Sequence, residues 1–324
     1  MHIFLSLLPE KQDEHEGQGF IKRIAGLLKY SSRHIQADEP AQADVVLFME
    51  SNRFKSRHDF ASFEKSDLLK RFAHKAYTLN YCDAPIAFLP GLYVCNPRQS
   101  YDPCWTRAIP YPWPSPNQQL QTFSPGLNTP DHIVSFRGSM SHPVRHKLLE
   151  VMSANPQLGP SQQINRWFNH TADEQFNYLV EIVNSRFVLC PRGIGTATYR
   201  LYESLLLGRV PVIISDDWVP PEDIDWSSFS LRISEERLDD LPALLNRYLR
   251  RWPEMRAAAC SAWNNFFSDS VLADFLFDQL ESLTYNRVPG VDWSYLQRRW
   301  KSPSFRRQNK WDYWSQAKRF YSRI

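Results

Sequence analysis

Short apolar runs and helical apolar patterns follow each other along the whole chain. Runs of strand length lie at 2–8, 44–49, 132–136, 187–190 and 210–215, and helical patterns lie at 20–30, 144–152, 173–185 and 197–207. Strands that alternate with helices in this way are typical of parallel sheets covered by helices. The pattern therefore predicts an α/β protein that begins like a Rossmann domain, and its 324 residues are enough for two domains.

Prolines are frequent between the two halves, in residues 103–130, which predicts an extended linker. We expect its aromatic residues Trp105, Tyr111 and Trp113 to pack onto the domains, with a wall for a sugar ring as the alternative. The predicted organisation is a first domain with this linker over residues 1–128, a second domain over 129–290 with helices at 235–251 and 254–285, and a tail over 291–324.

The composition indicates a soluble globular protein, with 43% hydrophobic and 23% charged residues. The net charge of +3 does not indicate a partner. The 5 cysteines show no paired metal spacing, so neither a disulfide framework nor a zinc site is predicted, and a reducing compartment fits best. No stretch approaches the roughly twenty apolar residues of a membrane span, and the N-terminus resembles a first strand more than a signal peptide. We therefore expect a cytoplasmic protein.

A glycine turn joins the strand at 187–190 to the helix at 197–207. Gly193 lets the backbone approach a ligand, Thr196 and Thr198 offer hydroxyls, and the free N–H groups at the helix start favour an anion. Arg192 on the turn can donate paired hydrogen bonds to a phosphate. These residues predict an anion-binding site.

Two charged residues of the same helix extend this prediction. Arg200 is placed to hold a phosphate together with Arg192, and Glu203 to accept hydrogen bonds from the hydroxyls of a ribose. Phosphate donors followed by such a carboxylate predict a nucleotide site. The alternative is a plain βαβ unit in which Arg200 and Glu203 pair with each other at a spacing of three residues.

The segments FVLCPRG, TATYRLYESLLLG, VPVIISDDWVPP and IDW, in this order, closely resemble the donor-binding segment of the exostosin family of glycosyltransferases. The resemblance implies a GT-B fold with two Rossmann-like domains facing a cleft and a C-terminal helix that crosses back to the first domain. It also implies a nucleotide-sugar bound by the C-terminal domain and transfer with inversion. Asp217, in the Asp-Trp pair, would then lie at the nucleobase or the sugar.

A second glycine turn, at Arg137-Gly138-Ser139, also resembles an element of this family. By this resemblance Arg137, Gly138, Ser139 and Arg145 would contact the diphosphate. The alternative is surface basic residues ahead of an amphipathic helix. His142 is expected to be a loop residue, with a contact to phosphate or acceptor as the alternative.

Inverting transfer requires a general base that accepts the proton of the acceptor hydroxyl. Glu16, after the first strand, is the first candidate, with capping or solvation of the following helix as the alternative. Glu50, after the second strand, and Asp83 are the next candidates, ahead of Asp13 and His15.

No metal or other cofactor is expected. Residues 223–225 spell an Asp-Ile-Asp metal motif of another glycosyltransferase fold, but GT-B enzymes generally stabilise the leaving diphosphate with cations and helix N-termini. The substrates implied are a UDP-sugar and a saccharide or glycolipid acceptor, in polysaccharide biosynthesis. A GDP-sugar-dependent, fucosyltransferase-like enzyme and a non-catalytic partner subunit of the same fold are the alternatives.

The tail interleaves cations with aromatic residues, among them Trp311, Trp314 and Tyr321 at helical spacing. It is expected to pack onto the first domain, with the inner face of an anionic membrane as a second contact. No nucleic-acid partner is expected, because no recognised motif accompanies the charge.

Overall fold

The computed structural model describes residues 1–8, 15–50, 60–113, 117–123, 129–164 and 170–310. The chain divides into two compact units. Unit 1 comprises Met1–Pro112, Asp217–Glu222 and Asp269–Ile324, and unit 2 comprises Trp113–Asp216 and Asp223–Ser268. The chain passes from one unit to the other after Pro112, Asp216, Glu222 and Ser268, whereas the predicted boundaries, which stay predictions, lie after residues 128 and 290. The difference arises because contacts, and not linker composition, decide where a segment packs.

Unit 1 contains a sheet of six parallel strands in the order β2-β1-β3-β4-β5-β6. The strands are β1 (His2–Leu8), β2 (Ile35–Gln36), β3 (Val45–Glu50), β4 (Ala76–Asn80), β5 (Gly91–Tyr93) and β6 (Thr106–Ala108). β1 and β3 confirm the first two predicted strands. Thr106–Ala108, predicted to lie in the linker, instead adds a strand because its backbone pairs with β5. Trp105 and Tyr111 are buried in this unit, as expected.

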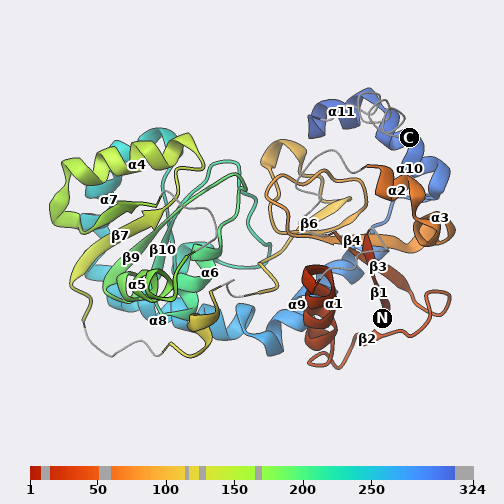
Figure 1. Cartoon of the computed structure of the whole chain (residues 1–324), viewed down its shortest axis with the longest axis horizontal. Helices are drawn as coiled ribbons and strands as arrows, with labels where there is room; N and C mark the ends of the chain where they lie inside the picture. Colours follow the sequence, from red (N-terminus) through yellow and green to blue (C-terminus); the bar gives the residue numbers. More distant parts are fainter. Residues whose placement is uncertain (9–14, 51–59, 114–116, 124–128, 165–169, 311–324) are drawn as a thin grey trace. The chain divides into compact units, whose positions relative to one another are not determined.

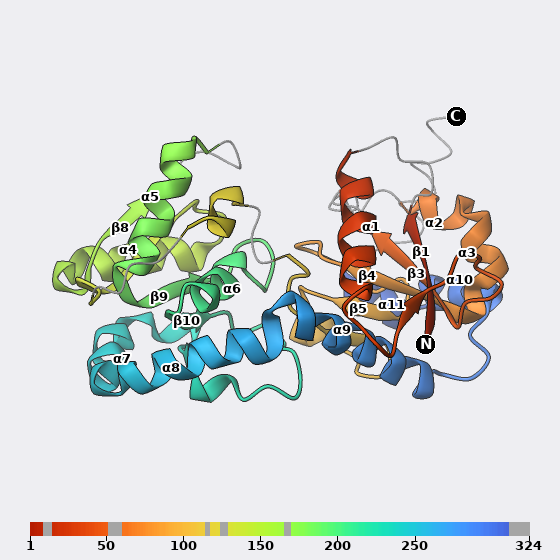
Figure 2. The ribbon, with the colours of Figure 1, turned by 90° about the horizontal axis from the view of Figure 1, so that it is seen from below.

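The helices of unit 1 come from both ends of the chain (Figures 1 and 2). They are α1 (His15–Leu28), α2 (Ala61–Lys65), α3 (Asp67–Phe72), α9 (Asp269–Tyr285), α10 (Trp293–Lys301) and α11 (Pro303–Asn309), with short 3-10 turns η2 (Ala73–Lys75) and η3 (Arg98–Ser100). α9 lies alongside α1, where Arg23 donates two hydrogen bonds to Asp269 at 2.5 and 2.6 Å. Trp300 of α10 is fully buried and donates to the Phe88 carbonyl at 2.9 Å. The predicted return of the C-terminal helices to the first domain is therefore confirmed, while Trp311, Trp314 and Tyr321 lie outside the described residues.

Unit 2 contains a sheet of five parallel strands in the order β11-β10-β9-β7-β8. The strands are β7 (His132–Gly138), β8 (Ser161–Gln163), β9 (Ser185–Pro191), β10 (Val210–Ile214) and β11 (Leu231–Arg232). The helices are α4 (Pro143–Ala154), α5 (Ala172–Val183), α6 (Tyr199–Leu206), α7 (Leu241–Tyr248) and α8 (Trp252–Ala262). Short turns complete the unit: η4 (Gln118–Gln121), η5 (Pro156–Leu158), η6 (Trp226–Ser228), η7 (Glu235–Asp240), η8 (Leu249–Arg251) and the π-helical η9 (Trp263–Phe267).

One predicted helix differs from the structure. The pattern at 254–285 predicts a single helix, but the backbone turns to an extended conformation at Ser268, between η9 and α9. Periodicity continues across such a break because both pieces bury apolar side chains, which is why the sequence does not reveal it. The break separates α8, in unit 2, from α9, in unit 1.

Helices cover both faces of the unit 2 sheet, and successive side chains of a strand contact helices on opposite faces. Val134 and Phe136 of β7 lie in one core with residues of α4 and α7, whereas Ser135 points to α5 and donates to the Glu181 carbonyl. The strand order reverses between β7 and β9 in unit 2 and between β1 and β3 in unit 1. Such reversals are where open α/β sheets bind ligands, at the carboxyl ends of the strands.

The two parallel sheets with their helices confirm the predicted α/β class with two Rossmann-like domains, the plan expected of a GT-B protein. The predicted cleft between the domains stays a prediction. Within the described ranges, no helix combines the length and the apolar character that crossing a bilayer requires.

Candidate functional site

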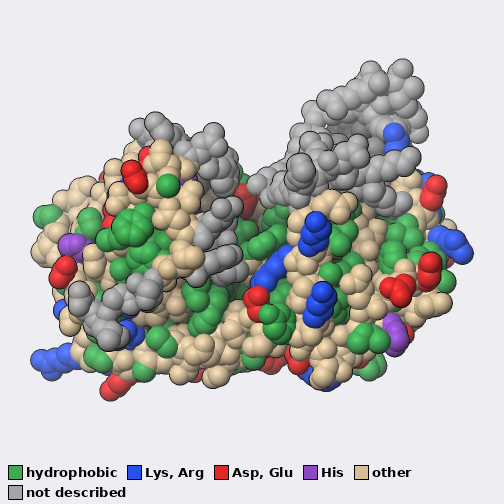
Figure 3. Space-filling model, turned by 60° about the horizontal axis from the view of Figure 1, so that its bottom comes forward, with side chains coloured by type: hydrophobic (Ala, Val, Ile, Leu, Met, Phe, Trp, Pro, Cys, Tyr) green, Lys and Arg blue, Asp and Glu red, His purple; other side chains and the backbone are tan. Residues whose placement is uncertain are grey.

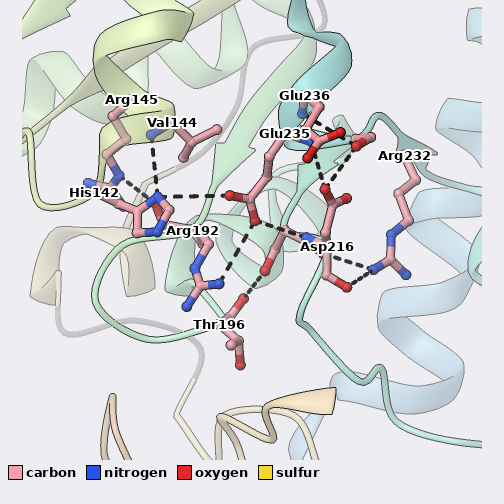
Figure 4. A network of polar contacts seen from close by, with 11 residues as sticks. His142, Val144, Arg145, Arg192, Thr196, Asp216, Arg232, Glu235 and Glu236 are labelled. Atoms are coloured by element: carbon pink, nitrogen blue, oxygen red, sulfur yellow. Dashed lines mark hydrogen bonds and ion pairs between the residues drawn. The ribbon is translucent and has the colours of Figure 1, made fainter. Parts of the chain in front are cut away.

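Four loops meet at the carboxyl edge of the unit 2 sheet (Figure 4). The loops after β7, β9, β10 and β11 bring His142, Arg192, Asp216 and Glu235 together, respectively. The loops after β7 and β9 lie on either side of the strand reversal. This edge is therefore the part of unit 2 where a ligand is expected.

Asp216 and Glu235 hold the loops after β10 and β11 to each other. The Asp216 N–H donates to Glu235 Oε1 at 3.0 Å, and the Glu235 N–H donates to Asp216 Oδ2 at 3.0 Å (Figure 4). Ser234 adds a hydrogen bond from its hydroxyl to Asp216 Oδ2 at 2.8 Å. Glu235 also lies near two cationic or titratable groups, with Oε1 3.9 Å from Arg192 Nη1 and Oε2 4.0 Å from His142 Nδ1. The Glu235 carboxylate therefore lies close to residues from all three other loops of this edge.

The glycine turn follows β9, as predicted, and approaches the loop after β7. A Cβ on Gly193 would lie 2.9 Å from Ser141 Oγ and 3.1 Å from an Arg145 nitrogen, so a larger residue there would displace side chains of the loop after β7 and of α4. Thr196 is buried, and its Oγ1 has no hydrogen-bond partner among the described residues. Thr198 is the N-cap of α6, but its side chain does not cap the helix. The turn thus offers hydroxyls and helical N–H groups, as the sequence indicates.

Arg200 is buried beneath this edge. Its guanidinium donates to the carbonyls of Arg137 and Leu189, the second at 3.4 Å, and lies over the Phe136 ring at 4.9 Å. Its Nε donates to the Tyr178 hydroxyl at 3.3 Å. These contacts join β7, β9, α5 and α6.

Glu203 meets Arg200 through Tyr178. The Tyr178 hydroxyl donates to Glu203 Oε2, and burial, followed by the nearby Glu203 carboxylate, raises the pKa of Tyr178 well above its ordinary value. The two predicted ligand residues therefore contact one tyrosine of α5 between them. This differs both from a phosphate and ribose pair exposed at the edge and from a direct ion pair.

Arg145 is a second internal brace. It donates to the carbonyls of Arg192 at 2.8 Å, Ser139 at 2.9 Å and Pro191 at 3.2 Å, so that one guanidinium ties the loop after β7 to the end of β9. Arg137 donates to both oxygens of Glu181. A Cβ on Gly138 would lie 3.2 Å from the Phe136 ring and 3.3 Å from an Arg200 nitrogen, so a side chain there would require these neighbours to shift slightly.

Asp217 differs from the other predicted donor residues in the unit to which it is assigned. It belongs to unit 1, where its carbonyl accepts from the Arg98 N–H at 2.9 Å and the neighbouring Trp218 forms a bridge with Pro97. In the predicted Asp-Ile-Asp motif, Asp225 caps η6 and Asp223 has a positive φ of 62°. Nothing in these contacts brings Asp223 and Asp225 to the edge described above.

Glu50, one of the predicted bases, has a buried side chain. It is 2% exposed at the end of β3, where it accepts from Thr78 Oγ1 at 2.7 Å and from Asn80 Nδ2. Burial raises the pKa of Glu50 to about 7, while the two hydrogen bonds lower it. Asp83 is partly exposed in the loop after β4. Glu16 and His15 lie in the first turn of α1 but their side chains are outside the described residues, as is the whole of Asp13.

Charge does not gather into one basic stripe on the face drawn in Figure 3. Among the described residues there, Lys and Arg side chains are interspersed with Asp and Glu. A nucleic-acid-binding face typically clusters its cations.

The sequence did not single out Asp216 or Glu235. The only local signal is their position directly after predicted strands, which many solvent-exposed carboxylates share. Their reciprocal hydrogen bonds require the loops after β10 and β11 to be neighbours. These loops are neighbours because β10 and β11 are adjacent in the sheet.

A model of a known protein family matches the part of the sequence that forms this edge. The model of the Exostosin GT47 domain matches residues 98–248, which include all four loops. The exostosin-1 homolog of Caenorhabditis elegans is 35% identical over 105 residues, 31% of this chain and 28% of that protein. A probable glucuronoxylan glucuronosyltransferase of Arabidopsis thaliana is 41% identical over 70 residues, 21% of this chain and 15% of that protein. The chain thus spans less than a third of the length of these curated relatives.

Solved structures resemble the chain more distantly. The crystal structure of an α1,3-fucosyltransferase covers 89% of this chain and 91% of that chain, with 11% identity and a TM-score of 0.45. Anabaena HepE in complex with UDP-glucose covers 88% and 98%, respectively, with 13% identity and a TM-score of 0.37. At these TM-scores neither likeness bears on function.

Proposed function

Because residues 98–248 belong to the exostosin family of glycosyltransferases, we propose that the protein transfers a sugar from a nucleotide-sugar to a saccharide acceptor. A UDP-sugar is the proposed donor, and a glycan or lipid-linked saccharide of polysaccharide biosynthesis the proposed acceptor. The observation that supports this most is that the family match includes the loops after β7, β9, β10 and β11, which form one edge.

The proposed donor site is this carboxyl edge. Arg192, the Gly193 backbone and the first N–H groups of α6 would bind the diphosphate, with the Thr196 and Thr198 hydroxyls beside them. Arg200 and Arg145 would act as positioning residues, since each ties the end of a strand to the loops that contact the ligand. Glu203 would reach a ribose only if Tyr178 released its carboxylate.

The proposed reaction inverts the anomeric carbon. The acceptor hydroxyl oxygen forms a bond to that carbon as the bond to the diphosphate oxygen breaks, and a base removes the hydroxyl proton. Glu16 remains the first candidate for the base, and Asp83 the next, because the carboxyl oxygens of Glu50 are buried and already accept hydrogen bonds. Charge on the leaving diphosphate would be stabilised by Arg192 and the helix start, with no metal ion needed.

Arg192 provides the test of the donor site. We expect the wild-type protein to bind uridine diphosphate in a calorimetric titration, unchanged by EDTA, and Arg192→Gln to bind it about tenfold more weakly, since one charge-assisted contact is lost. Arg250→Gln is the matched control, because Arg250 is exposed on η8 of the same unit.

The same titration distinguishes the alternatives. Tighter binding of guanosine diphosphate would favour the fucosyltransferase-like enzyme. Binding that EDTA abolishes would contradict the metal-independent mechanism. If no nucleotide binds, the proposed transfer by this chain is wrong, and a non-catalytic subunit becomes the better interpretation.

The tail suggests how a lipid-linked acceptor would be reached. α10 and α11 bury Leu296, Trp300 and Phe305 in unit 1 and expose cations on their other sides, namely Arg298, Lys301, Arg307 and Lys310. We propose that these cations contact an anionic membrane surface. Replacing all four by glutamine should abolish co-sedimentation with vesicles containing phosphatidylserine at low salt and leave nucleotide binding intact, whereas equal sedimentation of both proteins would contradict the contact.

A further inference from the structure

His142 is the N-cap of α4 and its ring has a defined hydrogen-bond arrangement. Its backbone is extended, and its Nδ1 accepts from the Val144 N–H at 3.3 Å. Pro143, between them, has no N–H of its own to cap. A ring nitrogen that accepts a hydrogen bond must carry a lone pair, so in the neutral imidazole the proton resides on Nε2.

The Nε2–H group is free to donate to a ligand. None of the described residues makes a hydrogen bond to Nε2, and the side chain is 27% exposed. Burial, together with the charges of Arg192 and Arg145, lowers the pKa of His142, against the opposing effect of Glu235. These influences favour the neutral imidazole, which donates without a positive charge.

His142 lies on a loop next to the residues of the proposed diphosphate site. Its loop packs against the glycine turn, where Ser141 and Gly193 are in close contact, and Arg192 lies beside the ring (Figure 4). The loops that carry His142 and Arg192 flank the strand reversal between β7 and β9. A ligand oxygen bound by Arg192 and the turn would therefore lie near the imidazole.

We infer that His142 contributes a neutral Nε2–H hydrogen bond to an oxygen of the nucleotide diphosphate, with its tautomer set by the cap of α4. The inference rests on the proposed function and adds a residue to that site. His142 retains its proton throughout the transfer. The hydrogen bond strengthens as negative charge builds on the leaving diphosphate, so the residue should affect turnover more than ground-state binding.

Two substitutions separate the cap from the donor. In His142→Asn the side-chain oxygen can replace Nδ1 as the cap, while the Nε2–H is lost. In His142→Gln the longer amide can place an N–H near the Nε2 position, while the cap geometry is lost. His146→Asn is the control, because His146 is exposed on α4, one turn further along.

The measurements are melting temperature, calorimetric titration with uridine and guanosine diphosphates, and hydrolysis or transfer of the matching nucleotide-sugar. We expect His142→Asn to melt like the wild type, to bind the nucleotide about threefold to fivefold more weakly, and to turn over at least tenfold more slowly. His142→Gln should melt at a lower temperature yet exceed His142→Asn in turnover.

The inference is overturned if the wild type binds a nucleotide and His142→Asn matches it in both binding and turnover. It is also overturned if His142→Asn and His142→Gln lose stability and turnover in parallel, since the ring would then serve the helix alone. If the wild-type protein binds no nucleotide, both the proposed function and this inference are wrong. If the wild type binds a nucleotide and His142→Asn behaves like it, the inference alone is wrong.

Discussion

Replacing Arg200 by alanine should lower the free energy of unfolding of unit 2 by about 3–5 kcal/mol, because buried acceptors would lose their donor and the Glu203 carboxylate would lose a nearby positive charge. Glu203 is 4% exposed and accepts a hydrogen bond from the Tyr178 hydroxyl, which Arg200 contacts through its Nε. The carbonyls of Arg137 and Leu189 would each lose a donor, and the Phe136 ring would lose its stacked cation. Urea unfolding followed by circular dichroism measures the change.

The same variant tests the sequence-based prediction that Arg200 holds a phosphate. If Arg200→Ala unfolds at the wild-type urea concentration but fails to bind the nucleotide, Arg200 contacts the ligand directly and the bracing role is wrong. If it retains both normal stability and normal turnover, neither role is correct. Arg250→Ala, which removes the same charge from an exposed position, should change the unfolding by less than about 0.5 kcal/mol.

Replacing Glu50 by glutamine should stabilise the protein at pH 8 by about 3 kcal/mol and have little effect at pH 4. Burial raises the pKa of Glu50 from 4.5 to about 7, so the folded state keeps a proton that the unfolded state releases. Stability from this group is therefore complete below pH 4.5 and is lost as the pH rises through about 7.

Glutamine suits the site because it resembles the protonated carboxyl. Asn80 Nδ2 can donate to the amide oxygen, since Asn80 Oδ1 is already occupied by the Cys82 N–H at 2.9 Å. The amide N–H can donate to Thr78 Oγ1, whose hydroxyl then donates to the Phe48 carbonyl at 3.0 Å. The side chain would thus satisfy all of its polar atoms without a charge.

The measurement is the difference in unfolding free energy between the two proteins from pH 4 to pH 8. Glu39→Gln, an exposed position in the same unit, should show no such dependence. A flat difference for Glu50→Gln would show that the carboxyl titrates normally. A complete loss of turnover in a stable Glu50→Gln protein would restore Glu50 as a candidate for the base.

Much of the candidate site could be placed from the sequence. β1, β3, β7, β9 and β10 lie within about two residues of the predicted runs, because apolar runs bounded by Gly and Pro are a local signal. The glycine turn at Arg192 and the start of α6 also follow from local residue types. What the sequence could not predict is which side chains of that segment turn inward.

Arg200 and Glu203 illustrate this limit. At a spacing of three on one helix they suggest either ligand contacts or mutual pairing. In the structure, the Tyr178 hydroxyl of α5 forms a hydrogen bond with each of them. Their burial depends on how α5 and α6 pack against the sheet. Charged residues are seldom buried, so the sequence favoured exposure, and only the nearby partners make burial possible.

The sequence by itself determined β1, β3, β7, β9 and β10, the glycine turns and the family resemblance, because these depend on residues close together in the chain. The tertiary structure decided the rest. It brought α9, α10 and α11 to unit 1, paired Asp216 with Glu235 across two strands, and set the His142 ring beside Arg192. Such contacts join residues that lie far apart in the sequence. They form only when the strands pair and the helices pack against the sheets.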